Sequence, residues 1–243
     1  MTVIDELLVY LDDGTVRLLE ECATALPGRT KQTLSSTLGR LTGKGWVTTT
    51  RDRTRGVNTY IITQSGSDTV TRTLAHLKIA DDQQWDERWF FVLFNIPERH
   101  RKHRDVLRNR LSAVGCGRIQ NSLWVTARNI QFELSDLLED ERIARAVTIV
   151  KPVLTPADAQ ALAAAFEWDW EQPNVLYQQF IENAQLYLKR KEHSVLGAKL
   201  LVYNYAKLLQ RDPKFPTFLE PKEYLRSKAH AQYERIRPYC YEN

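Results

Sequence analysis

Polar and apolar residues in the first third of the chain follow short helical periods. Apolar positions in 3–11 predict a helix, and Thr15 can cap a second one that runs to Ala25. Thr30 can cap a third helix. Its apolar face is formed by leucines spaced at i, i+4 and i+7, namely Leu34, Leu38 and Leu41. The pattern therefore predicts three short helices in succession.

The pattern changes to β-rich runs after Gly45. Residues 46–50 and 59–63 favour strands, and they flank the polar loop 51–58. Residues 65–79 again have a helical pattern. Three short helices followed by a charged hairpin are typical of a winged helix-turn-helix, which we expect over residues 1–80.

A second pattern begins at Trp85. The apolar run 89–94 predicts a buried strand, and an amphipathic helix is expected over 100–114. The side chains expected to face inward from this helix are Val106, Leu107, Leu111 and Val114. Two strands within 118–126, a helix near 130–140 and a strand at 146–150 follow. The order β-α-β-β-α-β predicts a ferredoxin-like sandwich.

The remainder of the chain is helical in pattern. Helices are expected at 174–191, 194–210 and 221–236. The fold class is therefore α+β, with three expected domains: a winged helix-turn-helix (1–80), a ferredoxin-like dimerisation domain (85–154) and a helical C-terminal effector domain (155–243). The polar residues 81–84 are interpreted as a linker.

Composition places the chain among ordinary globular proteins. Hydrophobic residues make up 43% and charged residues 26% of 243 residues. No apolar run approaches the ~20 residues of a membrane-spanning helix, and the start of the chain does not resemble a signal peptide. Cys22, Cys116 and Cys240 are scattered, which argues against a disulfide framework or a zinc site. We expect a cytoplasmic protein.

The distribution of charge is more informative than the net value of +4. Seven basic residues lie between Arg29 and Arg55, against the single acid Asp52. A second basic cluster spans 99–110. Such a cluster can simply be a solvated helix face. The first cluster, however, coincides with the third helix and the hairpin, where a winged helix meets DNA.

The third helix would enter the major groove with its N-terminal residues close to base edges. Gln can pair with adenine, whereas Lys and Arg contact guanine or phosphate. The loop of the hairpin is suited to backbone or minor-groove contacts. The expected DNA-binding residues are Arg29, Lys31, Gln32, Thr33, Ser36, Arg40, Arg51, Arg53 and Arg55. The alternative is an adaptor whose winged helix binds another protein.

The sequence contains no pattern typical of an enzyme. GxSxG, HExxH, P-loop and GxGxxG motifs are missing, and no catalytic residue, metal site or cofactor is expected. His100 and His103 lie within the second basic cluster, which disfavours a metal cation there. Aromatic residues around 168–187 could line a ligand cleft, or they could form the core of a helical bundle.

Several segments in order resemble the PaaX family of bacterial transcriptional repressors. The resemblance rests on short motifs spread along the chain: Leu38-Gly39-Arg40-Leu41, Gly45-Trp46, Tyr60-Ile61-Ile62-Thr63, Val92-Leu93-Phe94-Asn95-Ile96-Pro97-Glu98, Leu208-Leu209-Gln210-Arg211-Asp212-Pro213 and Leu219-Glu220-Pro221. It implies a homodimeric repressor that a small acyl-CoA or aryl-CoA releases from double-stranded DNA. Two-fold symmetry would match a pseudo-palindromic operator.

An acyl-CoA effector needs cationic groups near an apolar slot. Trp168, Trp170 and Tyr177 could form the apolar slot. Lys189 and Arg190 could supply the cationic groups. The sequence departs from the family at Tyr224-Leu225-Arg226-Ser227, where the family has Trp-Pro-Gly, and this segment is the first place to look for a different ligand.

The central region also resembles CRISPR-adaptation proteins with a ferredoxin-like fold, some of which are metal-dependent nucleases. A nucleic-acid-binding protein or nuclease of that kind is therefore the alternative function. Its first strand would end in an acidic metal ligand, and this chain has Asn95 there. Because a neutral amide is a poor ligand for a hard divalent cation, we expect no nuclease activity.

Overall fold

The computed structural model describes residues 1–81, 88–164, 170–212 and 215–241. The chain divides into two compact units. The N-terminal unit comprises Met1–Lys78, Phe180–Lys207 and Lys228–Asn243, and the central unit comprises Ile79–Gln179 and Leu208–Ser227. The expected α+β class is confirmed. The three contiguous domains and the linker at 81–84 stay predictions, and residues 82–84 lie outside the described residues.

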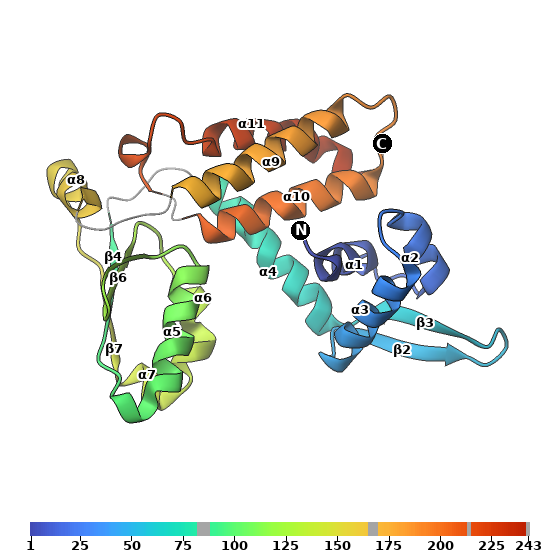
Figure 1. Ribbon diagram of the computed structural model, residues 1–243, viewed down its shortest axis with the longest axis horizontal. Helices are drawn as coiled ribbons and strands as arrows, with labels where there is room; N and C mark the ends of the chain where they lie inside the picture. Colours follow the sequence, from blue (N-terminus) through green and yellow to red (C-terminus); the bar gives the residue numbers. More distant parts are fainter. Residues whose placement is uncertain (82–87, 165–169, 213–214, 242–243) are drawn as a thin grey trace. The chain divides into compact units, whose positions relative to one another are not determined.

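The N-terminal unit begins with three helices and a small antiparallel sheet. Their bounds are α1 (Val3–Leu11), β1 (Arg17–Leu18), α2 (Leu19–Ala25), α3 (Lys31–Gly43), β2 (Val47–Asp52) and β3 (Val57–Ile62), followed by α4 (Gln64–Asp81). The strand order is β1-β3-β2. Thr30 caps α3 as expected, because its hydroxyl accepts the backbone N–H of Thr33 at 3.2 Å. The order of three helices followed by a hairpin is that of a winged helix-turn-helix, and we use this term for the segment below (Figure 1).

The expected start of the second helix at Thr15 is wrong. Arg17 and Leu18 instead form a short strand paired with Tyr60 and Thr59 of β3. The helix begins at Leu19, and the Glu21 carboxylate accepts the Leu18 backbone N–H at 2.6 Å. Pairing with a strand more than 40 residues later in the sequence therefore overrides the local capping signal of Thr15.

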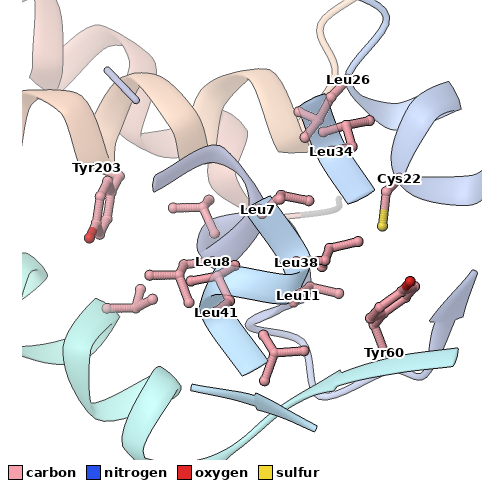
Figure 2. Packing of buried hydrophobic residues seen from close by; sticks show 13 residues of the cluster. Leu7, Leu8, Leu11, Cys22, Leu26, Leu34, Leu38, Leu41, Tyr60 and Tyr203 are labelled. Atoms are coloured by element: carbon pink, nitrogen blue, oxygen red, sulfur yellow. The ribbon is translucent and has the colours of Figure 1, made fainter. Parts of the chain in front are cut away.

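The core of this unit joins the winged helix to a helix from the C-terminal third. Leu34, Leu38 and Leu41 are fully buried, as expected, against leucines of α1. Tyr203 of α10 (Val195–Arg211) belongs to the same cluster (Figure 2). Its hydroxyl donates to Thr73 Oγ1 of α4 at 3.3 Å.

A partly buried ion pair reinforces this junction. Lys207 Nζ lies 2.9 and 2.8 Å from the two carboxylate oxygens of Asp5 in α1. Burial alone would raise the pKa of Asp5, but the hydrogen bonds from Lys207 and Thr2 lower it overall. The winged helix is thus completed by α10.

Aromatic stacking holds the remaining helices of the N-terminal unit together. Phe180 of α9 (Glu171–Leu188) stacks on Tyr205 of α10, with ring centroids 5.1 Å apart. Tyr205 in turn stacks on Tyr233 of α11 (Arg226–Ile236) at 4.9 Å. Of the aromatic residues around 168–187, Phe180 therefore lies in an ordinary bundle core, which is one of the two expectations for that group.

The central unit contains the expected ferredoxin-like sandwich. Its elements are β4 (Phe90–Phe94), η1 (Glu98–His100), α5 (Arg101–Ala113), β5 (Gly117–Gln120), β6 (Leu123–Thr126), α6 (Gln131–Leu138), α7 (Glu141–Ala144) and β7 (Val147–Val150), followed by α8 (Pro156–Ala164) and η2 (Thr217–Leu219). The short helix η3 (Arg237–Cys240) follows α11. The antiparallel sheet has the order β5-β6-β4-β7, which is the strand arrangement of that fold.

Alternating residues of the sheet supply two cores. Val92 and Trp124 pack with Leu107 and Leu111 on the face that α5 and α6 cover (Figure 1). The sheet residues between these, such as Phe91 and Val125, belong to a second cluster. It also contains Ala159 of α8 and Phe215.

The expectation that Val106 faces inward is wrong. Its exposed fraction is 48%, whereas Leu107 and Leu111 are fully buried and Val114 is buried. Leu107, Leu111 and Val114 share one stripe at i, i+4 and i+7, and Val106 lies outside that stripe.

Candidate nucleic-acid interface

Helix α3 has a buried leucine face and an exposed polar face. Gln32, Thr33, Ser36 and Arg40 are all exposed. The hydroxyls of this face are partly used within the helix, since Ser36 Oγ donates to the Thr33 carbonyl at 3.0 Å. Arg40 Nη2 donates to the buried Thr37 hydroxyl at 2.9 Å, which fixes the guanidinium close to the helix. In the described part of the chain, the Gln32 side chain forms no hydrogen bond, so both its donor and its acceptor are available.

The two cations at the start of α3 have intramolecular partners. Arg29 Nε and Nη2 donate to the two carboxylate oxygens of Glu6, each at 2.8 Å. These hydrogen bonds raise the pKa of Arg29. Lys31 forms an exposed ion pair with Glu20. Phosphate contacts from Arg29 or Lys31 would have to compete with these carboxylates.

The wing is a six-pair hairpin closed by a defined turn. Strand β2 pairs with β3 from Val47 opposite Ile62 to Asp52 opposite Val57. The Asp52 carboxylate accepts the backbone N–H groups of Thr54 at 2.8 Å and Arg55 at 3.1 Å. Gly56 has a φ of +67°, a left-handed conformation that glycine adopts without steric cost.

Three arginines project from this hairpin. Arg51, Arg53 and Arg55 are exposed, and Arg55 Nε lies 3.9 Å from Asp52. They share one unit with the exposed face of α3. Sequence reasoning anticipated this arrangement because helix periodicity and turn chemistry are local signals.

The expected effector residues are divided between the two units. Trp168 lies outside the described residues. Trp170 and Tyr177 belong to the central unit and both contact the Tyr224 ring edge-on, with centroids 5.1 and 5.7 Å apart. Lys189 and Arg190 are exposed and belong to the N-terminal unit.

Two residues of the segment that departs from the family, Tyr224 and Arg226, belong to a buried polar cluster. Asp212 accepts hydrogen bonds from Tyr177 at 2.5 Å and from Tyr224 at 2.8 Å. Arg226 reaches Asp212 at 3.4 Å and Glu220 at 2.5 Å. Burial raises the pKa of Glu220 to about 7, although Arg226 opposes the shift. Sequence reasoning missed this cluster because its members have no recognisable spacing.

The position expected to hold a metal ligand in a nuclease is occupied by an exposed amide. The Asn95 backbone N–H donates to the Ala146 carbonyl at 2.9 Å, just after the end of β4. Within the described ranges, no group of three His, Cys, Asp or Glu side chains could hold a metal ion. No described helix is long and apolar enough to cross a membrane.

Comparison with known proteins supports the resemblance in the central region. Residues 82–163 match the family described as the PaaX protein central Cas2-like domain. The uncharacterized protein Rv0674 from Mycobacterium tuberculosis has a similar solved structure, with a TM-score of 0.54 and 17% identity over 90% of this chain and 87% of that one. At that identity the likeness concerns the fold alone. No curated protein sequence matches the chain. The central segment thus matches the central domain of PaaX proteins, in agreement with the resemblance.

Proposed function

We propose that this protein is a transcriptional regulator that binds double-stranded DNA through α3 and the wing between β2 and β3. The observation that carries the proposal is the exposed polar face of α3, with Gln32 unoccupied, in the same unit as the three wing arginines. A face of this kind suits the major groove, and arginines on a hairpin suit the neighbouring phosphates.

Phosphate contacts would supply most of the affinity. Each neutralised phosphate releases counterions, which makes the binding free energy favourable and strongly dependent on salt. Arg51 and Arg53 on the wing are exposed and have no ion pair among the described residues. They can therefore neutralise phosphates without first breaking an internal contact, unlike Arg29.

A homodimer would present two such surfaces to a pseudo-palindromic operator. Occupancy of the promoter by this dimer would repress transcription. The family resemblance, supported by the match over residues 82–163, favours this mode. It also favours release by an acyl-CoA or aryl-CoA that binds the DNA-incompetent arrangement more tightly. Trp170 and Tyr177, which meet on Tyr224, are the expected effector residues that support a ligand site in the central unit.

The first test is DNA binding over a series of salt concentrations. Fragments selected by the purified protein from random duplex DNA would define the operator. Replacing Arg51, Arg53 and Arg55 together by Ala should weaken binding to operator and random DNA alike. It should also reduce the salt slope by up to about 3, since each lost phosphate contact removes roughly 0.9.

The control replaces Lys228 and Arg235, two exposed cations of α11, by Ala. This variant should retain the salt slope of the parent. An unchanged slope in the wing variant would assign the docking surface elsewhere. Absence of binding to any duplex would favour the adaptor function instead, and cleavage of DNA or RNA that needs Mg²⁺ or Mn²⁺ would favour the nuclease.

A further inference from the structure

The central unit contains a cavity of about 390 Å³. Its wall is formed by the end of α5, strands β5 and β6, the first turns of α9 and the last turn of α10. The side chains that matter for recognition are Arg118, Trp124, Leu176, Tyr177, Leu208 and Arg211. The volume lies near the lower end of the ~300–1,000 Å³ range of small-molecule sites.

The charge of this cavity is positive and uncompensated. Arg118 and Arg211 line it, and no acidic residue occurs among the described residues of the wall. Both arginines are exposed, and neither side chain has a hydrogen bond or an ion pair within the described part of the chain. The nearby Asp212 carboxylate is already occupied by Tyr177 and Tyr224. Two guanidinium groups that share one cavity without a counter-charge favour an anion.

Apart from the arginines, Ser112 and Gln172, the wall is largely apolar. Leu176 and Leu208 offer aliphatic surface, and the buried Trp124 adds an aromatic one. The Trp124 indole N–H has no acceptor in the residues that the structure describes. The Tyr177 hydroxyl donates to Asp212, so this buried side chain borders the cavity with its ring. An apolar body with a charged end fits this combination.

The cavity is held open by the backbone around it. Gly115 has a φ of +82°, and a Cβ atom at this position would lie 2.5 Å from the Arg211 carbonyl oxygen. Arg128 Nη2 donates to the carbonyl oxygens of Val114 at 2.6 Å and Gln210 at 3.1 Å. These contacts fix the end of α10 against the segment that leads into β5. A site that is preformed in this way avoids the cost of ordering its walls on binding.

We infer that this cavity binds a small organic acid, with its carboxylate between Arg118 and Arg211 and its apolar body against Leu176, Leu208 and Trp124. The limited volume favours a free acid over a whole coenzyme A thioester. A regulatory role for such an acid rests on the DNA-binding function proposed above. Helix α10 would transmit the effect of the acid to the winged helix. The helix that carries Leu208 and Arg211 also carries Tyr203, which lies in the winged-helix core, and Lys207, which pairs with Asp5.

The test titrates the full-length protein with 3-phenylpropionate and octanoate by calorimetry, and with the two corresponding neutral amides. The acids should bind and the amides should bind at least about tenfold more weakly, because a charge-assisted hydrogen bond is lost. The double variant Arg118→Gln, Arg211→Gln should weaken binding of the acids at least about tenfold and leave the amides unaffected. Both side chains are exposed, so the variant should fold, and circular dichroism checks this.

The matched control is Arg142→Gln, Arg145→Gln, which removes two exposed cations of the same unit away from the cavity wall. It should bind the acids like the parent. Equal affinity for acids and amides, unchanged affinity in the Arg118/Arg211 variant, or failure of both acids to bind would overturn the inference. Because calorimetry contains no DNA, these results are independent of whether the protein binds an operator. Loss of DNA binding alone would contradict only the proposed function.

Discussion

At the scale of single residues, Gln32 distinguishes base recognition from general attraction to DNA. Its side chain is exposed in the first turn of α3, and an amide can donate to and accept from adenine simultaneously. We expect Gln32→Ala to weaken binding to the selected operator by about 1–3 kcal/mol, with little effect on random duplex DNA. Fluorescence anisotropy on both duplexes measures the difference.

Gln185 of α9 provides the matched control, because it is an exposed glutamine of the same unit outside the winged helix. Gln185→Ala should leave both affinities unchanged. Equal losses on operator and random DNA in the Gln32 variant would remove Gln32 from base recognition.

Glu220 should make the stability of the protein depend on pH. Burial raises the pKa of its carboxyl from 4.5 to about 7 in the folded protein. Between these two pH values the folded state therefore holds a proton that the unfolded state releases. The contribution of this carboxyl to the free energy of unfolding is complete below pH 4.5 and is lost as the pH rises through 7. Glu220→Gln remains neutral and should remove this loss of stability, which amounts to about 3 kcal/mol.

Urea unfolding of parent and variant at pH 5 and pH 8 tests this expectation. The parent should lose stability relative to Glu220→Gln between the two values. Glu223→Gln, an exposed neighbour in the same segment, serves as the control and should follow the parent. A constant difference between parent and Glu220→Gln would show that the buried carboxyl keeps its charge.

At the scale of elements, α10 is expected to stabilise the winged helix. Tyr203 is buried in the same cluster as Leu34 and Leu38. Tyr203→Ala should lower the free energy of unfolding by about 3–5 kcal/mol, because it leaves a cavity. Tyr203→Phe should cost only about 1 kcal/mol, since it removes the single hydrogen bond to Thr73.

Hydrogen exchange locates the effect of Tyr203→Ala. Amides of α1 and α3 should exchange faster in this variant, whereas Tyr241→Ala, which alters a tyrosine with an exposed fraction of 73%, should leave them unchanged. If α1 and α3 keep their protection in Tyr203→Ala, α10 does not support the winged helix.

The sequence predicted those elements whose causes are local. The Thr30 cap located the start of α3, the leucine period located its buried face, and the apolar run 89–94 located β4. The two-residue strand β1 was not predicted, because only its pairing with Tyr60 and Thr59 defines it. The acidic partners of Arg226, and the tyrosines that donate to Asp212, were missed for the same reason. Of the candidate site, α3 and the wing were predictable, and the cavity between Arg118 and Arg211 was not.

At the scale of the whole molecule, segments distant in the sequence combine in each unit. Asp5 and Lys207 are 202 residues apart and form one ion pair, and Arg128 contacts the Gln210 carbonyl across 82 residues. Periodicity and capping report only on near neighbours in the chain, so they favour contiguous domains. The division of α10 between the two units depends on such long-range contacts.

The symmetry of the proposed dimer gives the last prediction, which concerns the operator. Two recognition helices related by a two-fold axis require half-sites about one helical turn, or a multiple of it, apart. Inserting roughly 5 bp between the half-sites would place them on opposite faces of the duplex, so only one winged helix could bind at a time. We expect the affinity to fall at least about tenfold, as the second set of base contacts is lost.

A roughly 5-bp insertion outside both half-sites is the control and should leave binding unchanged. Sedimentation of the complex should show two chains on the intact operator. The same affinity for the split and the intact operator, with one chain bound to each, would mean that the protein reads DNA as a monomer. In that case the single α3 and its wing would have to supply all the specificity, and the loss in Gln32→Ala would then account for a larger share of the discrimination between operator and random DNA.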